Sequence, residues 1–416
     1  MMTRQKLAIL AFILVLFASG CESSTPQQKQ MKATLFHLPG RSRWHEEQSP
    51  TRTDAWCSIP VCRTMDTLTF FEHFYTRRRI LSHLLQVYPR CLANSGLTSR
   101  KVPDTMTRIS PFRGVYAIPV TPFNEDLTID WVSLRNCIAF SVEAEAHGIV
   151  LPVNASEGPY LTDAERKEVL KVGIEVVDGA VPVIGGVSGA STAISIELTK
   201  NAADLGADAV MAMPPNGASG SIIWDHYTAI AETGQLPVWI QNNKPPAGPV
   251  VPTAMMVRML NELKHVDYVK EESYLPGQIM TQLFAEAGDT VKGIMGGMGG
   301  RYLVDEYRRG SCGTMPAGHI TDAHVKLWNA LDAGGVDSDG LQIVTEEARV
   351  LWERMIPSLN FEFMFGANAY KAAYWRRGII KTPLTRNPAS KTLDKLDYEE
   401  LDTILDRMDD LLDTNI

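Results

Sequence analysis

Cysteine, positive charge and long apolar runs are all scarce in this sequence. Only six of the 416 residues are cysteine, and the net charge of -8 gives no reason to expect a nucleic-acid partner. The apolar run from Leu7 to Ala18 is too short to span a bilayer. A hydrophobic content of 45% with 21% charged residues is ordinary for a soluble globular protein and is enough for a sizeable core.

The spacings typical of metal sites are also missing. Cys57 and Cys62 have no second cysteine pair to complete a ligand set. His226, His319 and His324 are isolated on helix-like stretches or loops. We therefore expect no metal and no cofactor.

The chain joins two different compositions near residue 105. Residues 1–105 contain 14 Lys and Arg against 7 Asp and Glu, whereas the remainder contains 26 against 41. Four of the six cysteines lie in the first part. The discontinuity predicts a domain boundary at this point.

Residues 1–21 have the pattern of a secretory signal. Basic residues precede the apolar run, and Ala18-Ser-Gly-Cys21 then resembles a bacterial lipoprotein cleavage and lipidation site. Residues 22–105 lack a sustained period and indicate a linker or disordered extension. An alternative is an artefact of gene prediction, since Met106 resembles a natural start. The protein would be a membrane-anchored lipoprotein if the signal is genuine, and cytoplasmic if translation starts at Met106.

From residue 106 onward, short apolar runs alternate with stretches of helical pattern. The strand-like runs begin near Val115, Gly148, Val181, Ala209, Val238, Val266, Thr290 and Gly313. Eight such units predict a parallel sheet closed into a (β/α)8 TIM barrel, an α/β fold, over residues 106–335. An open doubly wound sheet would need a phosphate loop after the first strand, where Thr121-Pro-Phe123 stands. Residues 336–416 then predict C-terminal helices at about 341–355, 361–375 and 398–412.

Active sites of such barrels lie at the C-terminal ends of the strands. Lys270 ends the sixth strand-like run, where burial of an amine would favour its neutral, nucleophilic form. Glu272 follows two residues later and is a candidate acid/base or a structural partner. The run from Gly296 to Gly300, which includes the substrate-binding candidate Gly297, suggests a close approach of backbone to a ligand. Amides suited to bind hydroxyl or carboxylate groups end other strands: Asn154, Gln241 and Asn242.

The motifs at these strand ends resemble, as an ordered set, the dihydrodipicolinate synthase / N-acetylneuraminate lyase family. The set consists of Pro119-Val-Thr-Pro-Phe123, Asn154-Ala-Ser-Glu157, Leu161-Thr-Asp-Ala-Glu-Arg166, Val269-Lys270-Glu and Gly313-Thr-Met-Pro316. The resemblance implies a class I lyase in which Lys270 forms a Schiff base with a 2-oxo acid. It further implies that Asn154, Ala155 and Ser156 hold the substrate carboxylate, and that the protein is a homotetramer.

Departures from the family pattern favour one branch of it. Gln241 and Asn216 stand where the synthases have tyrosines, and Pro245-Pro-Ala-Gly248 stands where they have a carboxylate-binding arginine. The resemblance then points to the branch that dehydrates 2-keto-3-deoxy sugar acids such as 2-keto-3-deoxyarabonate. Two alternatives remain: an aldolase that cleaves or forms C3–C4 with pyruvate as one partner, and a non-catalytic, lipid-anchored protein that binds 2-oxo acids.

Overall fold

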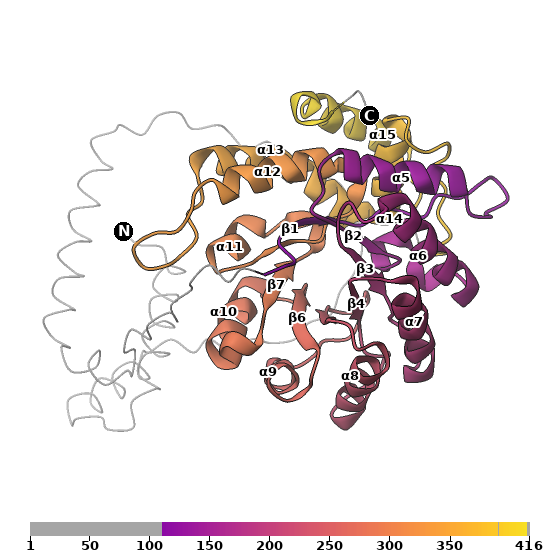
Figure 1. Ribbon diagram of the computed structural model, residues 1–416. Helices are drawn as coiled ribbons and strands as arrows, with labels where there is room; N and C mark the ends of the chain where they lie inside the picture. Colours follow the sequence, from indigo (N-terminus) through magenta and orange to yellow (C-terminus); the bar gives the residue numbers. More distant parts are fainter. Residues whose placement is uncertain (1–109, 390, 414–416) are drawn as a thin grey trace, which may run out of the picture. The chain divides into compact units, whose positions relative to one another are not determined.

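A computed structural model describes residues 110–389 and 391–413. The predicted signal peptide, the extension up to residue 105 and Met106 lie outside the described residues. The described chain forms a closed barrel in which each strand pairs in parallel with the next and β8 pairs with β1 (Figure 1). The predicted (β/α)8 fold is therefore confirmed.

The strands are short, and most are buried along their whole length. They are β1 Gly114–Ala117, β2 Gly148–Leu151, β3 Val183–Gly186, β4 Ala209–Ala212, β5 Val238–Asn242, β6 Val266–Glu271, β7 Gly293–Gly296 and β8 Gly313–Thr314. Two begin later than the sequence suggested. Pro182 has no N–H for the ladder and precedes β3, and Gly288–Thr290 forms a 3-10 turn before β7.

Helices cover the outside of the barrel. They are α5 Trp131–Glu143, α6 Asp163–Val177, α7 Thr192–Leu205, α8 Ser221–Gly234, α9 Thr253–Glu262, α10 Pro276–Ala287, α11 Leu303–Arg308 and α12 Thr321–Asp332. Local signals fix several ends: Thr162 and Glu165 form the predicted capping box of α6, and Gly206 ends α7 with a φ of 83°.

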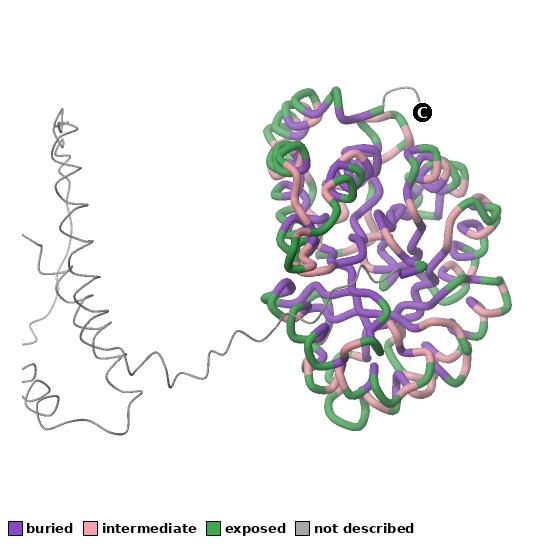
Figure 2. The backbone as a smooth tube through the Cα atoms, turned by 60° about the vertical axis from the view of Figure 1, so that its left-hand side comes forward, coloured by how far each residue is buried: buried purple, intermediate pink, exposed green. Residues whose placement is uncertain are grey.

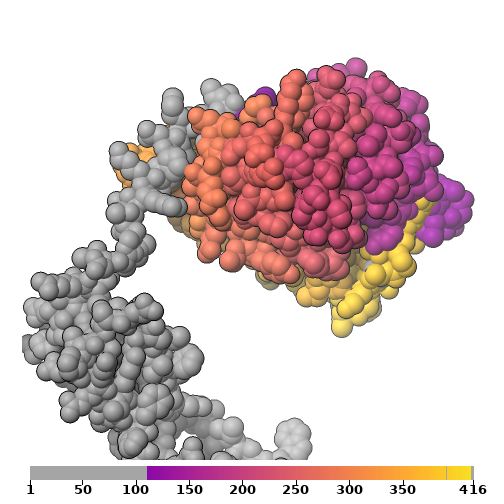
Figure 3. Space-filling model, turned by 90° about the horizontal axis from the view of Figure 1, so that it is seen from below, coloured from indigo at the N-terminus to yellow at the C-terminus, as the bar shows by residue number. Residues whose placement is uncertain are grey.

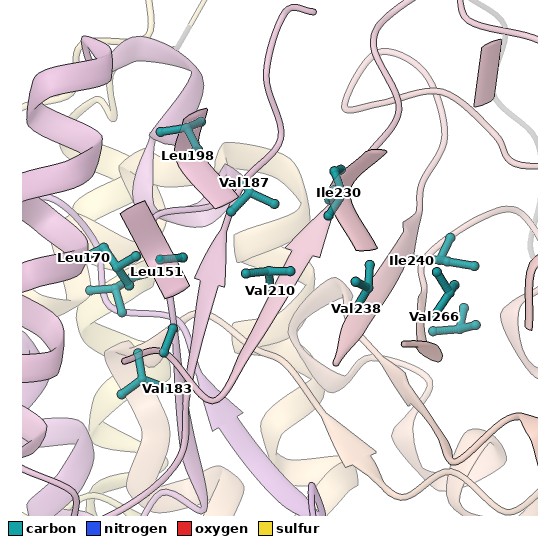
Figure 4. Packing of buried hydrophobic residues seen from close by; sticks show 14 of the residues in the cluster. Leu151, Leu170, Val183, Val187, Leu198, Val210, Ile230, Val238, Ile240 and Val266 are labelled. Carbon is teal, nitrogen blue, oxygen red and sulfur yellow. The ribbon is translucent and has the colours of Figure 1, made fainter. Parts of the chain in front are cut away.

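Two apolar layers hold the barrel together. Between the strands and the helices, aliphatic side chains such as Leu151, Leu170, Val210 and Ile230 pack closely (Figure 4). Inside the barrel lie larger side chains, among them Trp239 and Tyr268, whose stacked ring centroids are 4.6 Å apart. This filled interior leaves the strand ends as the place for chemistry. Figure 2 shows that the buried residues gather in the interior and the exposed ones at the periphery.

The C-terminal helices differ from the predicted ones in their boundaries. Helix α13, Glu346–Phe365, continues through Pro357 and ends at Gly366, where φ is 55°. Burial of Met355 and Leu359 on either side of the proline outweighs the lost hydrogen bond. Helices α14, Ala367–Arg376, and α15, Lys395–Asp406, complete the extension.

Candidate active site

Lys270 lies at the C-terminal end of β6 and is almost wholly enclosed. Its side chain is 3% exposed, and in the sheet it is paired with Gln241 of β5 and Met295 of β7. Its Nζ lies 3.4 Å from Oε2 of Glu272. A primary amine in this position is shielded from water and has a carboxyl group within reach.

Glu272 is the centre of a hydrogen-bonded cluster around this lysine. Its Oε2 accepts from Gln241 Nε2 at 2.8 Å and from Asn243 Nδ2 at 3.3 Å. Its Oε1 accepts from the backbone N–H of Met298 at 3.2 Å. These donors, together with Lys270, compensate the burial of a carboxylate that is only 8% exposed as a residue. The sequence placed Lys270, Glu272 and Gln241 on one side of the barrel mouth, and the structure brings them together.

Asn242 does not join this cluster. Successive residues of a strand face opposite sides, and Asn242 points away from Lys270. Its Nδ2 donates to Glu271 Oε2 at 2.7 Å, and its Oδ1 accepts from Val251 N at 2.7 Å. That Asn242 binds substrate therefore stays a prediction, and its side chain is engaged with the protein itself. Asn243, which was not among the predicted site residues, is the amide beside Glu272.

The glycine run after β7 leaves space for buried carboxylate side chains rather than for a phosphate. A Cβ at Gly297 would lie 2.0 Å from Glu272 Oε1, and one at Gly296 would lie 1.8 Å from Glu306 Oε2. A Cβ at Gly299 would lie 2.6 Å from Glu362 Oε2. Three acids from different parts of the chain thus pack against this backbone, and the approach of a ligand that the sequence suggested stays a prediction.

Glu306, on α11, is a buried acid that the sequence did not single out. Burial raises the pKa of its carboxyl well above the usual range, and the nearby charge of Glu272 raises it further. Burial likewise raises the pKa of Glu271. Glu306 and Glu271 are therefore two buried acids whose carboxyl pKa values are raised by desolvation. No spacing in the sequence could reveal Glu306, because only the packing of α11 on β7 places it there.

Asn154, Ala155 and Ser156 form a 3-10 turn after β2. Asn154 Nδ2 donates to Ala247 O at 3.2 Å, Ser156 Oγ donates to Pro119 O at 2.8 Å, and Ala155 packs on the interior cluster. The side chains of Asn154 and Ser156 are thus engaged with the protein itself. The turn lies at the same end of the barrel as Lys270, since both follow the C-terminal ends of strands.

His319 and His324 take part in protein contacts rather than a metal site. His319 Nε2 lies 3.3 Å from Glu362 Oε1, and His324 Nε2 lies 2.8 Å from Gly299 O. Within residues 110–389 and 391–413, no group of three or more His, Cys, Asp or Glu side chains is arranged to hold a metal ion. In the same part of the chain, no helix combines the length and the apolar character that crossing a bilayer requires.

Comparison with known proteins identifies relatives of the described barrel. Residues 111–296 match the sequence profile of the Dihydrodipicolinate synthetase family. An L-2-keto-3-deoxyarabonate dehydratase of Azospirillum brasilense is 27% identical over 282 residues, which cover 66% of this chain and 88% of that protein. A 4-hydroxy-tetrahydrodipicolinate synthase of Clostridium perfringens is 33% identical over 164 residues, or 39% of this chain. The match spans only 56% of that synthase.

A solved structure agrees with this relationship. The crystal structure of a dihydrodipicolinate synthase from Rhodopseudomonas palustris superposes with a TM-score of 0.65 at 25% identity. The superposition covers 72% of this chain and 99% of the synthase. The similarity therefore extends over nearly the entire architecture of that protein.

Proposed function

We propose, from the premise that this chain carries a dihydrodipicolinate synthetase family domain, that it is a lyase acting through a Schiff base on Lys270. The observation that carries the proposal is the enclosed amine of Lys270 with Glu272 at 3.4 Å. The substrate in this proposal is a 2-keto-3-deoxy sugar acid such as 2-keto-3-deoxyarabonate. The homotetramer expected from the resemblance stays a prediction.

The proposed reaction begins when Lys270 attacks the C2 ketone. Loss of water gives an iminium, which withdraws electrons from C3 so that a C3 proton can leave to form an enamine. The enamine then expels the C4 hydroxyl, which departs as water once it has gained a proton. Hydrolysis finally frees the lysine. In this proposal Glu272 carries the protons, which is supported by the 3.4 Å between its Oε2 and Lys270 Nζ.

Dehydration is favoured over carbon–carbon cleavage by the residue at position 241. Gln241 donates its amide N–H to Glu272 and cannot relay a proton as a tyrosine would. The similarity to a dehydratase over 88% of that protein's length supports the same choice. An aldolase would use the same lysine and the same enamine, so it remains the second candidate.

The two reactions can be separated by their products. The protein is incubated with 2-keto-3-deoxyarabonate, and the mixture is analysed by mass spectrometry. Dehydration gives a product lighter than the substrate by one water, whereas aldol cleavage releases pyruvate. In parallel, borohydride is added with a panel of 2-oxo acids, and the intact mass of the protein is measured. Absence of any adduct would contradict the Schiff-base mechanism, and release of pyruvate would contradict dehydration.

A further inference from the structure

Glu157 ends the proposed carboxylate-binding turn in a conformation that residues other than glycine seldom adopt. Its φ of 55° and ψ of 28° lie in the left-handed region. Such a conformation costs free energy and persists where surrounding contacts fix it. The Glu157 side chain is buried, so those contacts are made inside the protein.

The contacts of the Glu157 carboxylate come from the C-terminal extension. Its Oε2 forms a buried ion pair with Lys371 of α14. Its Oε1 accepts from the backbone N–H groups of Arg386 at 2.8 Å and Asn387 at 3.0 Å. Lys371 in turn donates to Leu384 O at 2.7 Å. We call residues 382–387 the C-terminal strap.

The strap also holds the neighbouring loops of the barrel mouth. Phe123, which closes the Pro119–Phe123 motif, has Lys371 Nζ 4.0 Å and the Arg386 guanidinium carbon 4.4 Å from its ring centroid. Thr382 Oγ1 donates to Phe123 O at 2.7 Å. Figure 3 shows the yellow C-terminal residues bordering the violet start of the barrel.

Arg386 connects the C-terminal strap to α6. Its guanidinium donates to both oxygens of Glu165, at 2.7 and 2.8 Å, and to Leu127 O at 2.8 Å. The motifs around Phe123, Glu157 and Glu165 are thus joined by one segment that lies more than 200 residues later in the chain.

The first two of these loops are locked to each other at the turn itself. Thr121 Oγ1 donates to Ser156 O at 2.7 Å, and Ser156 Oγ donates to Pro119 O at 2.8 Å. A shift of Glu157 would therefore be transmitted directly to Ser156 and to the backbone of the turn.

We infer that Glu157 is a positioning residue which, with Lys371 and the C-terminal strap, fixes the turn Asn154–Ser156 in the form that binds the substrate carboxylate. The inference rests on the proposed function, because it assigns a cause to the binding of a 2-oxo acid. It gives the C-terminal helices a role in recognition of the substrate, although they lie outside the barrel.

The Glu157→Gln variant tests this inference without an obvious loss of folding. Gln keeps an oxygen to accept from Arg386 and Asn387, and it replaces the charged oxygen that faces Lys371 with an uncharged NH2 group. Burial lowers the pKa of Lys371 to about 8. When the charge of Glu157 is removed, Lys371 can therefore lose its proton at little cost and stay buried as a neutral amine. Arg386→Ala is a second variant, which removes the partly exposed ion pair between the C-terminal strap and Glu165.

Two ketones separate binding of the substrate carboxylate from reaction at the ketone. Borohydride trapping is measured against the concentration of pyruvate and of methyl pyruvate, which carries the same ketone without a charge. We expect the half-saturating concentration of pyruvate to rise about tenfold in Glu157→Gln, while that of methyl pyruvate changes by less than about twofold. For the sugar-acid substrate, KM should rise in the same proportion with little change in kcat.

Asp402→Asn is the matched control, because it removes an ion pair with Arg376 on the same helix as Lys371 without touching the turn. It should leave both half-saturating concentrations unchanged. Equal shifts for the two ketones, or no shift for pyruvate, would overturn the inference while the Schiff-base function stood. Absence of any adduct on the wild-type protein would instead overturn the proposed function.

Discussion

Lys270 Nζ lies 3.4 Å from Glu272 Oε2, and Gln241 and Asn243 donate hydrogen bonds to that same oxygen. The carboxylate is therefore held in place before any substrate arrives. Two strand ends and the glycine run after β7 supply its partners. A carboxyl group fixed beside an enclosed amine is the arrangement that the proposed enamine mechanism would use.

Replacement of Lys270 by alanine should abolish the borohydride adduct with pyruvate. The enclosed amine is the proposed nucleophile, and alanine cannot form an iminium. Intact mass followed by peptide mapping measures the adduct. Lys292→Ala, which removes an exposed lysine paired with Asp267, should retain the adduct in full. An adduct that persists in Lys270→Ala would exclude this lysine.

Glu272→Gln should lower turnover by roughly 100-fold while the adduct still forms. The amide keeps the size of the side chain but cannot carry a proton. Glu271→Gln is the control, since this adjacent acid is bound by Asn242 and Ser273 away from Lys270. We expect less than about tenfold loss in that variant. Comparable losses in both would argue against a specific role for Glu272.

Gly297→Ala should displace Glu272 and reduce kcat by more than about tenfold. The added Cβ would lie 2.0 Å from Glu272 Oε1, so the carboxylate would have to move away from its partners. Steady-state kinetics and the trapped adduct are measured together. Gly179→Ala is the comparison, because its methyl would meet nothing within 4 Å; it adds a positive φ of 75°, a cost that Gly297, with a φ of -140°, does not carry. Equal kcat values in the two variants would contradict the prediction.

The ion pair between Glu165 and Arg386 should stabilise the protein less in acid. Hydrogen bonds from Arg386 lower the pKa of Glu165 from 4.5 to about 2. A carboxyl group with a depressed pKa in the folded state contributes stability above pH 4.5 and loses it as the pH falls towards 2. The difference in Tm between wild type and Glu165→Gln should therefore shrink from pH 7 to pH 3. A difference of constant size would show that the charge is not responsible.

A chain that begins at Met106 should fold and retain the activity of the full-length chain. All eight strands and the C-terminal helices lie between Gly114 and Leu411, and β1 closes the barrel against β8 within this range. Circular dichroism and turnover of both chains provide the measurement. An insoluble product, or activity confined to the full-length chain, would mean that residues 1–105 are needed.

The sequence by itself determined the fold and the position of the proposed nucleophile. Eight apolar runs alternating with amphipathic ones are a local pattern, and the end of each run marks one edge of a parallel barrel. Lys270 and Gln241 could be placed on that edge because they follow such runs. Glu272 was placed with them by its distance of two residues from the lysine.

Only the tertiary structure decided which side chains meet. In β5 and the residue after it, Asn242 binds Glu271 and Asn243 lies beside Glu272. Because β5 is buried along its whole length, its apolar residues do not mark which face an amide takes. Lys371 and Arg386 lie more than 200 residues along the chain from Glu157 and Glu165, so their contacts depend on how α14 and the C-terminal strap pack on the barrel. Glu306 meets Gly296 through the packing of α11 on β7. Periodicity records the face that a residue presents, whereas a contact between distant segments depends on three-dimensional packing that no local pattern encodes.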